Sequence, residues 1–155
     1  MTLAVHTARI GHRDPDVLDV TRKSAGPDGI AFAPSWAILR PALDALRCAE
    51  TMRSAADTPP FPEADPVRYA EGAEAMRRAA ETVRGSTWAL YSAAYLAEMR
   101  ESYRTQRAAW DALLSRERVV LVCYCTDHER CHRTLLARDI LPRLGARYEG
   151  EVSRG

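Results

Sequence analysis

The chain has 155 residues, 46% of them hydrophobic, and its 22 basic and 21 acidic side chains give a formal net charge of +1. This length and composition predict a single domain over residues 1–155 with a core of ordinary size. A nearly balanced charge argues against long nucleic acid or an anionic membrane as a partner. It leaves room for a local basic site that holds a small anion.

The N-terminal sequence shows no secretory signal pattern, and no apolar run approaches the roughly 20 residues needed to span a bilayer. We therefore expect a cytoplasmic protein with reduced cysteines, so its four Cys residues do not indicate a disulfide framework. The frequent Ala, Arg, Asp and Glu are typical of GC-rich coding, which suggests a bacterial or phage source.

The first third of the chain predicts two short strands followed by a helix. Residues 3–10 and 17–21 are rich in apolar and β-branched side chains and end at turn-forming residues. Ser35 can cap a helix that begins near Trp36. Pro41 is expected either to kink this helix or to begin a second one.

A Pro-rich stretch near residues 57–64 predicts a short linker. Asp65 followed by Pro66 is typical of a helix start. Gly85 is expected to end this helix, and helical spacing of apolar residues then continues over 88–114. The three tryptophans are assigned to the core: Trp36, Trp88 and Trp110.

The last third predicts a strand, a short loop and a helix. Residues 119–125 form an apolar run that is expected to place Cys125 at the carboxyl end of the main strand. A helix opens near Cys131 and ends near Gly145, and residues 148–152 suit an edge strand. Strands alternating with helices predict an α/β fold with a small, mostly parallel sheet flanked by helices.

The helix start after residue 130 is the candidate site. Unpaired N–H groups and the helix dipole attract anions there and lower the pKa of a nearby thiol. A helix beginning one turn earlier, from Thr126, is the alternative that capping-box spacing to Glu129 allows. We take Cys125, Cys131 and His132 as the candidate catalytic residues.

Four interpretations of this segment stay open. The one we favour is non-covalent binding of a small phosphorylated or nucleotide-like anion. The second is a cysteine-dependent enzyme acting on such a ligand. The third is a structural or zinc-bound interaction domain, in which only one of Cys123 and Cys125 is expected to join Cys131. The fourth is simple packing, with buried thiols acting as small hydrophobic groups.

The ligand-binding residues are predicted from the parallel sheet, because the carboxyl ends of its strands meet at one edge. Those that could complete a site are Arg9, Arg22, Ser24, Tyr95 and Arg133. No metal ligand and no cofactor is assigned, although zinc would suit the cysteines. The expected partner is a small anionic molecule, and a homodimer is the expected oligomer if the chain self-associates.

Cys123-Tyr124-Cys125, then Cys131-His132-Arg133 followed by Leu136-Ala137, resembles the C-terminal signature of a bacterial and phage family, domain-of-unknown-function family 488. Thr7–Ile10 and Asp19–Arg22 resemble its opening elements, and Tyr95 and Met99 lie where the family has a Tyr-rich helix. Family members often carry an acidic residue soon after the first strand cysteine, and here Asp127 could take that place. The resemblance implies an α/β fold and a shared site at Arg9, Arg22, Cys131, His132 and Arg133, with no settled activity.

Overall fold

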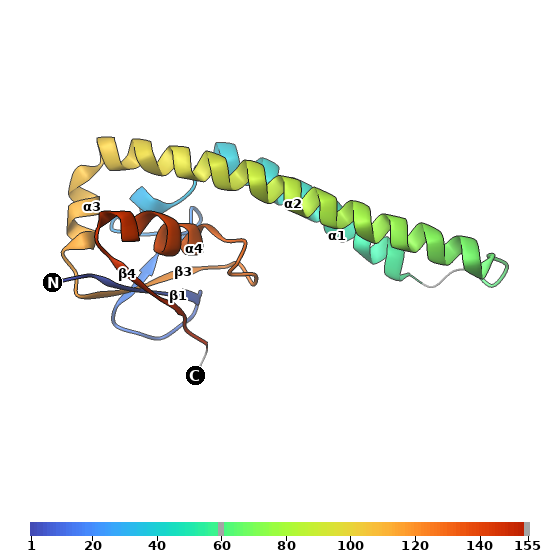
Figure 1. The fold of residues 1–155 in the computed structure, drawn as a ribbon, viewed down its shortest axis with the longest axis horizontal. Coiled ribbons are helices and arrows are strands. Elements are labelled where there is room, and N and C mark those ends of the chain that lie inside the picture. The colour runs from blue at the N-terminus through green and yellow to red at the C-terminus, as the bar shows by residue number, and fades with distance from the viewer. Residues whose placement is uncertain (59–60, 154–155) are drawn as a thin grey trace. The chain divides into compact units, whose positions relative to one another are not determined.

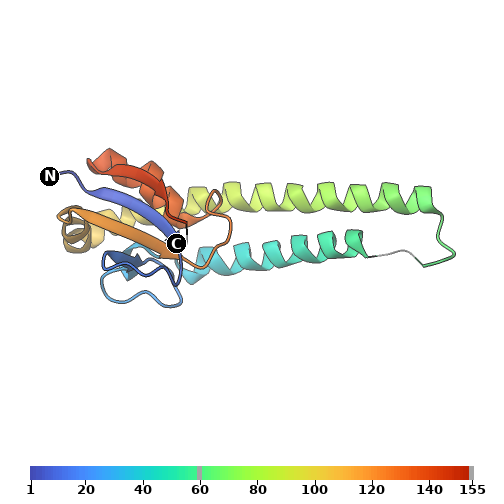
Figure 2. The same ribbon diagram turned by 90° about the horizontal axis from the view of Figure 1, so that it is seen from below.

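The computed structural model describes residues 1–58 and 61–153. It contains a four-stranded sheet in the order β2-β3-β1-β4, in which every pair of neighbouring strands is parallel. Figure 2 shows β1 between β3 and β4. The strands are β1 (Ala4–Arg9), β2 (Val17–Asp19), β3 (Arg118–Cys123) and β4 (Arg147–Glu151). The predicted small parallel sheet is confirmed.

The central strand β3 is buried on both faces. Its residues Val119–Val122 are at most 1% exposed, as expected for an apolar run in the middle of a parallel sheet. On one face Val120 and Val122 pack with Ala8 of β1. The register pairs Arg9 with Cys123, so the carboxyl ends of β1 and β3 lie side by side.

Short helical segments complete the part of the chain that contains the sheet (Figure 1). Their bounds are η1 (Ile30–Phe32), α3 (Arg107–Leu114), α4 (His132–Thr134), η2 (Leu135–Ile140) and η3 (Leu141–Leu144). The helix predicted up to Gly145 is thus one α-helical turn followed by a π-helical and a 3₁₀ segment. With these segments beside the parallel sheet, the α/β class is confirmed.

The described residues separate into two compact units, Met1–Trp36 with Ser92–Gly155, and Ala37–Tyr91. The first holds the sheet. The second consists of most of α1 (Trp36–Asp57) and the first part of α2 (Pro66–Thr105). The single domain predicted for 1–155 stays a prediction, because this division does not show whether either unit folds alone.

Within the second unit, alanines allow close approach of α1 and α2. Those buried are Ala49, Ala56, Ala73 and Ala80. Arg77 of α2 also forms an ion pair with Asp57 of α1 at 2.9 Å. The predicted helix start is confirmed, since the Asp65 carboxylate accepts the backbone N–H of Val67 at 2.9 Å and Pro66 begins α2. Of the predicted linker 57–64, residues 59–60 lie outside the described residues.

The structure corrects the predicted end of the helix at Gly85 and the burial of two tryptophans, and it decides between the two alternatives for Pro41. α2 continues through Gly85, because helix-forming residues on both sides outweigh one glycine. Pro41 begins no second helix but lies inside α1. Of the tryptophans, Trp110 is buried, whereas Trp36 is 42% exposed and Trp88 is half-buried. Among the described residues, none of the helices is long and apolar enough to span a membrane.

Candidate functional site

The candidate site lies where β3 ends and α4 begins. β3 ends at Cys123, so Cys125 lies two residues beyond the strand rather than at its end. Cys131 has extended backbone and immediately precedes α4. The alternative helix start near Thr126 is therefore wrong. The start predicted at Cys131 is confirmed.

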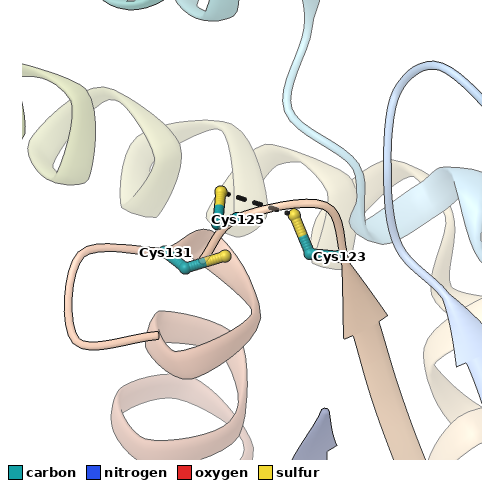
Figure 3. A group of neighbouring side chains, drawn as sticks. All are labelled: Cys123, Cys125 and Cys131. Carbon is teal, nitrogen blue, oxygen red and sulfur yellow. Dashed lines mark hydrogen bonds between the residues drawn. The ribbon is translucent and has the colours of Figure 1, made fainter. Parts of the chain in front are cut away.

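Three thiols meet at this junction. The Sγ atoms of Cys123, Cys125 and Cys131 all lie within 4.8 Å of one another, and those of Cys123 and Cys125 are 3.6 Å apart (Figure 3). The expectation that only one of Cys123 and Cys125 joins Cys131 is wrong, because residues two apart in an extended segment share a face. Cys123 and Cys131 are buried, and Cys125 is half-buried.

His132 faces this cluster with one ring nitrogen. Its Nδ1 lies 3.8 Å from the Cys123 Sγ and 4.0 Å from the Cys131 Sγ. Its Nε2 lies 2.8 Å from the carbonyl oxygen of Val20, which can only accept a hydrogen bond. The neutral ring therefore carries its proton on Nε2 and turns the Nδ1 lone pair toward the sulfurs.

The three thiols differ in the direction of their pKa shifts. Hydrogen bonds with the thiols of Cys125 and Cys131 lower the pKa of Cys123, and His132 beside it acts in the same direction. The hydrogen bond with Cys123 raises the pKa of Cys125 to about 12. Burial raises the pKa of Cys131.

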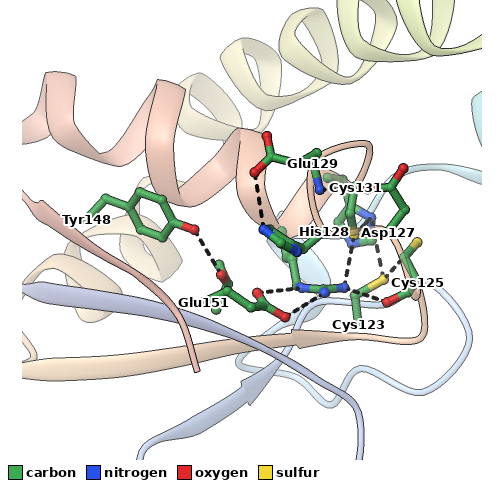
Figure 4. Close-up of polar contacts among 11 residues, drawn as sticks. Cys123, Cys125, Asp127, His128, Glu129, Cys131, Tyr148 and Glu151 are labelled. Carbon is green, nitrogen blue, oxygen red and sulfur yellow. Dashed lines mark hydrogen bonds and ion pairs between the residues drawn. The ribbon is translucent and has the colours of Figure 1, made fainter. Parts of the chain in front are cut away.

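Arg133 lies beneath the loop with its side chain 1% exposed. Its guanidinium donates to both carboxylate oxygens of Glu151, at 2.8 and 3.4 Å, and to the carbonyl oxygen of Cys125 at 3.0 Å (Figure 4). The same group reaches the Cys131 Sγ at 3.4 Å. Burial alone would raise the pKa of Glu151, but hydrogen bonds from Arg133 and Thr7 lower it. Arg133 therefore ties β4 to the cysteine loop.

Two other predicted ligand-binding residues are bound within the fold. Arg22 donates to the carbonyl oxygens of Ala33 and Pro34, at 3.2 and 2.7 Å. Tyr95 is fully buried and its hydroxyl donates to the carbonyl oxygen of Phe32 at 2.7 Å. Both side chains hold the segment before α1 in place.

Exposed polar groups lie beside the thiol cluster. Arg9 is exposed at the carboxyl end of β1. Ser24, also exposed, donates to the Asp19 carboxylate at 2.6 Å and accepts from the Tyr124 hydroxyl at 3.1 Å. Lys23 lies 5.8 Å from the centre of the Tyr124 ring. The structure therefore brings Ser24 to the cysteine loop through Tyr124.

Sequence reasoning missed Glu151, Asp19 and Tyr124 as parts of this site. Tyr124 lies between two cysteines in a run that resembles a strand, so its residue type does not reveal that it lies outside β3. Glu151 lay in the predicted edge strand, but no local signal paired it with Arg133, which is 18 residues away in sequence.

Residues 72–144 match a family model described as "DUF488-N3a: Active DUF488-N3 subclade". The matched segment includes the three clustered cysteines, His132 and Arg133. The match supports a DUF488-family domain over these residues. No curated protein and no solved structure matched the chain. The resemblance inferred from the cysteine motif is thereby confirmed, while the opening motifs at residues 7–10 and 19–22 precede the matched DUF488 segment.

Proposed function

We propose that this DUF488 domain binds a small anionic ligand, phosphorylated or nucleotide-like, at the carboxyl edge of its sheet. The observation that carries the proposal is the grouping of exposed cationic and aromatic side chains there. Arg9 follows β1, Lys23 lies in the segment after β2, and Tyr124 follows β3. All three are exposed, and Tyr124 keeps 47% of its surface in solvent.

The chemistry of these groups suits a phosphorylated ligand. Arg9 and Lys23 supply donors that favour an anionic oxygen. The Tyr124 ring offers a flat surface on which a base or sugar can pack. Asp19 and Ser24 provide oxygen atoms at the same edge that can bond sugar hydroxyl groups. Arg22 and Arg133, which are already bound to protein oxygens, act as supports for this edge.

Thermal unfolding in the presence of inorganic phosphate, ribose 5-phosphate, AMP or ADP tests the proposal. A ligand that binds only the folded state raises Tm, and the rise grows with the logarithm of its concentration above Kd. Arg9→Ala should weaken binding about tenfold, the equivalent of one charge-assisted hydrogen bond. Arg68→Ala, which removes an exposed arginine of α2, is the matched control. Tm values that none of these compounds changes would contradict the proposal.

The alternative is a cysteine-dependent enzyme acting on the same class of ligand. It would require Cys125 to meet the ligand, since Cys123 and Cys131 are 4% and 1% exposed. Incubation followed by mass spectrometry of the ligand separates the two functions. An unchanged ligand supports a binding module. Ligand consumption that is lost in Cys125→Ser and retained in Cys48→Ser would favour the enzyme.

A further inference from the structure

We propose that Cys123, Cys125, Cys131 and His132 bind one zinc ion in a tetrahedral Cys₃His site. The four side chains come from the end of β3, the following loop and the first residue of α4. This metal centre goes beyond the proposed ligand binding and does not depend on it.

The three sulfurs, and the His132 Nδ1 relative to two of them, are spaced close to what zinc requires. Zn–S bonds of about 2.3 Å and Zn–N bonds of about 2.0–2.1 Å place tetrahedral sulfurs roughly 3.8 Å apart, and nitrogen roughly 3.6 Å from sulfur. The Cys123 Sγ is 3.6 Å from the Cys125 Sγ and 3.8 Å from the His132 Nδ1. No pair among the three sulfurs exceeds 4.8 Å (Figure 3). Small side-chain shifts would complete the tetrahedron.

The orientation of His132 is the second argument. A zinc-bound histidine usually donates its other ring N–H to a carbonyl or carboxylate, which fixes the tautomer and the ring. His132 has this arrangement, with Nε2 2.8 Å from the Val20 carbonyl oxygen and Nδ1 directed at the cysteines. Simple packing of buried thiols would not require a histidine lone pair among them.

Charge is the third argument. Three thiolates and one Zn²⁺ leave a net charge of −1 in a buried place, which needs a nearby cation. The guanidinium of Arg133, which also pairs with Glu151, lies 3.4 Å from the Cys131 Sγ and offsets part of this charge. Arg133 thus donates a hydrogen bond to a ligand sulfur, as residues around a metal site commonly do.

The site would be structural rather than catalytic. Four protein ligands leave no open position for water or substrate. Two of the three sulfurs belong to side chains that are at most 4% exposed. The ion would fix the loop of residues 124–131, which has no regular secondary structure, to both β3 and α4. It would thereby hold Tyr124 in place at the proposed ligand edge.

Elemental analysis of the zinc-supplemented, desalted protein tests the centre. Wild type and Cys48→Ser should each retain one zinc per chain, because Cys48 is an exposed cysteine of α1. Cys125→Ser should lose the zinc. Cys125 is half-buried, so this variant is the ligand substitution with the best prospect of folding. A chelator should lower Tm in wild type and Cys48→Ser and leave Cys125→Ser unchanged.

Cobalt substitution gives a readout that does not depend on stability. Co²⁺ in the wild type should show thiolate charge-transfer bands and strong tetrahedral d–d bands. His132→Ala should change the d–d bands while Cys48→Ser keeps them. Zinc-free wild type, or zinc bound equally well by Cys125→Ser, would overturn the centre. A wild type that retains no zinc but shows a phosphate or nucleotide Tm shift would overturn the centre alone, whereas full zinc without such a shift would overturn the ligand proposal alone.

Discussion

Glu151 in β4 holds the buried guanidinium of Arg133 through both carboxylate oxygens, at 2.8 and 3.4 Å. Arg133 in turn reaches the carbonyl oxygen of Cys125 and the sulfur of Cys131. One ion pair therefore connects the edge strand of the sheet to the cysteine loop. Movement of the loop away from the sheet would break the hydrogen bond from Arg133 to the Cys125 carbonyl oxygen.

Glu151→Gln should lower the free energy of unfolding by about 3 kcal/mol, because it leaves Arg133 buried without its counter-ion. The measurement is urea unfolding at neutral pH. Glu149→Gln in the same strand is the matched control, since Glu149 pairs with exposed Arg147 at the surface. That control should change stability by less than about 1 kcal/mol. Equal losses of unfolding free energy in the two variants would show that the Arg133–Glu151 pair stabilises the fold no more than a surface pair does.

The strands could be predicted because their apolar, β-branched runs are bounded by turn residues, and β1, β2 and β3 lie within or next to the expected ranges. The end of β3 could not. Cys123-Tyr124-Cys125 continues the strand pattern in residue type, and nothing local shows that the backbone turns after Cys123.

Long-range contacts were beyond sequence reasoning for a related reason. In the sequence, Arg133 is an ordinary basic residue at a helix start. Its partner Glu151 is brought to it only by the folding of β4 onto the sheet. Likewise, the orientation of His132 depends on the backbone carbonyl of Val20, which lies 112 residues earlier in the sequence. Neither partner leaves a periodic or compositional signal.

A second buried hydrogen-bond centre lies at Ser102. Its hydroxyl donates to the Ala31 carbonyl oxygen at 2.6 Å and accepts from the Trp110 indole N–H at 3.1 Å. Ser102→Ala should cost about 2 kcal/mol of stability, because both partners are left buried without a partner at that position. Ser115→Ala, at the exposed end of α3, should stay within about 0.5 kcal/mol. Thermal and urea unfolding of the two variants checks this, and a neutral Ser102→Ala would contradict it.

Acidification should weaken the ion pairs that join the loop between β1 and β2 to β3. Arg118 donates to Asp14 at 2.8 Å and to Asp16 at 2.9 Å. The hydrogen bond from Arg118, and then that from the Asp16 backbone, lower the pKa of Asp14 from 3.8 to about 2. Since the folded-state pKa lies below the unfolded one, this contribution is fully present above about pH 4 and is lost as the pH falls toward about 2.

Urea midpoints measured across that acidic range test the assignment. In Asp14→Asn the part of the pH dependence due to this carboxyl group should vanish, so its curve should be flatter than that of the wild type. Asp44→Asn provides the comparison, because Asp44 pairs with Arg47 on an exposed helix face. If Asp14→Asn and wild type lose stability in parallel on acidification, Asp14 does not carry the effect.

Gly85 offers a direct test of the continuous helix α2. A Cβ added at Gly85 would meet nothing within 4 Å, and alanine in a helix interior is favoured over glycine by about 0.5–1 kcal/mol. Gly85→Ala should therefore stabilise the protein by roughly that amount in thermal or urea unfolding. Gly145→Ala should instead destabilise it by roughly 1–2 kcal/mol, because Gly145 ends η3 with φ +95°, where a side chain is strained. Destabilisation by Gly85→Ala would mean that the helix ends there, as the sequence alone had indicated.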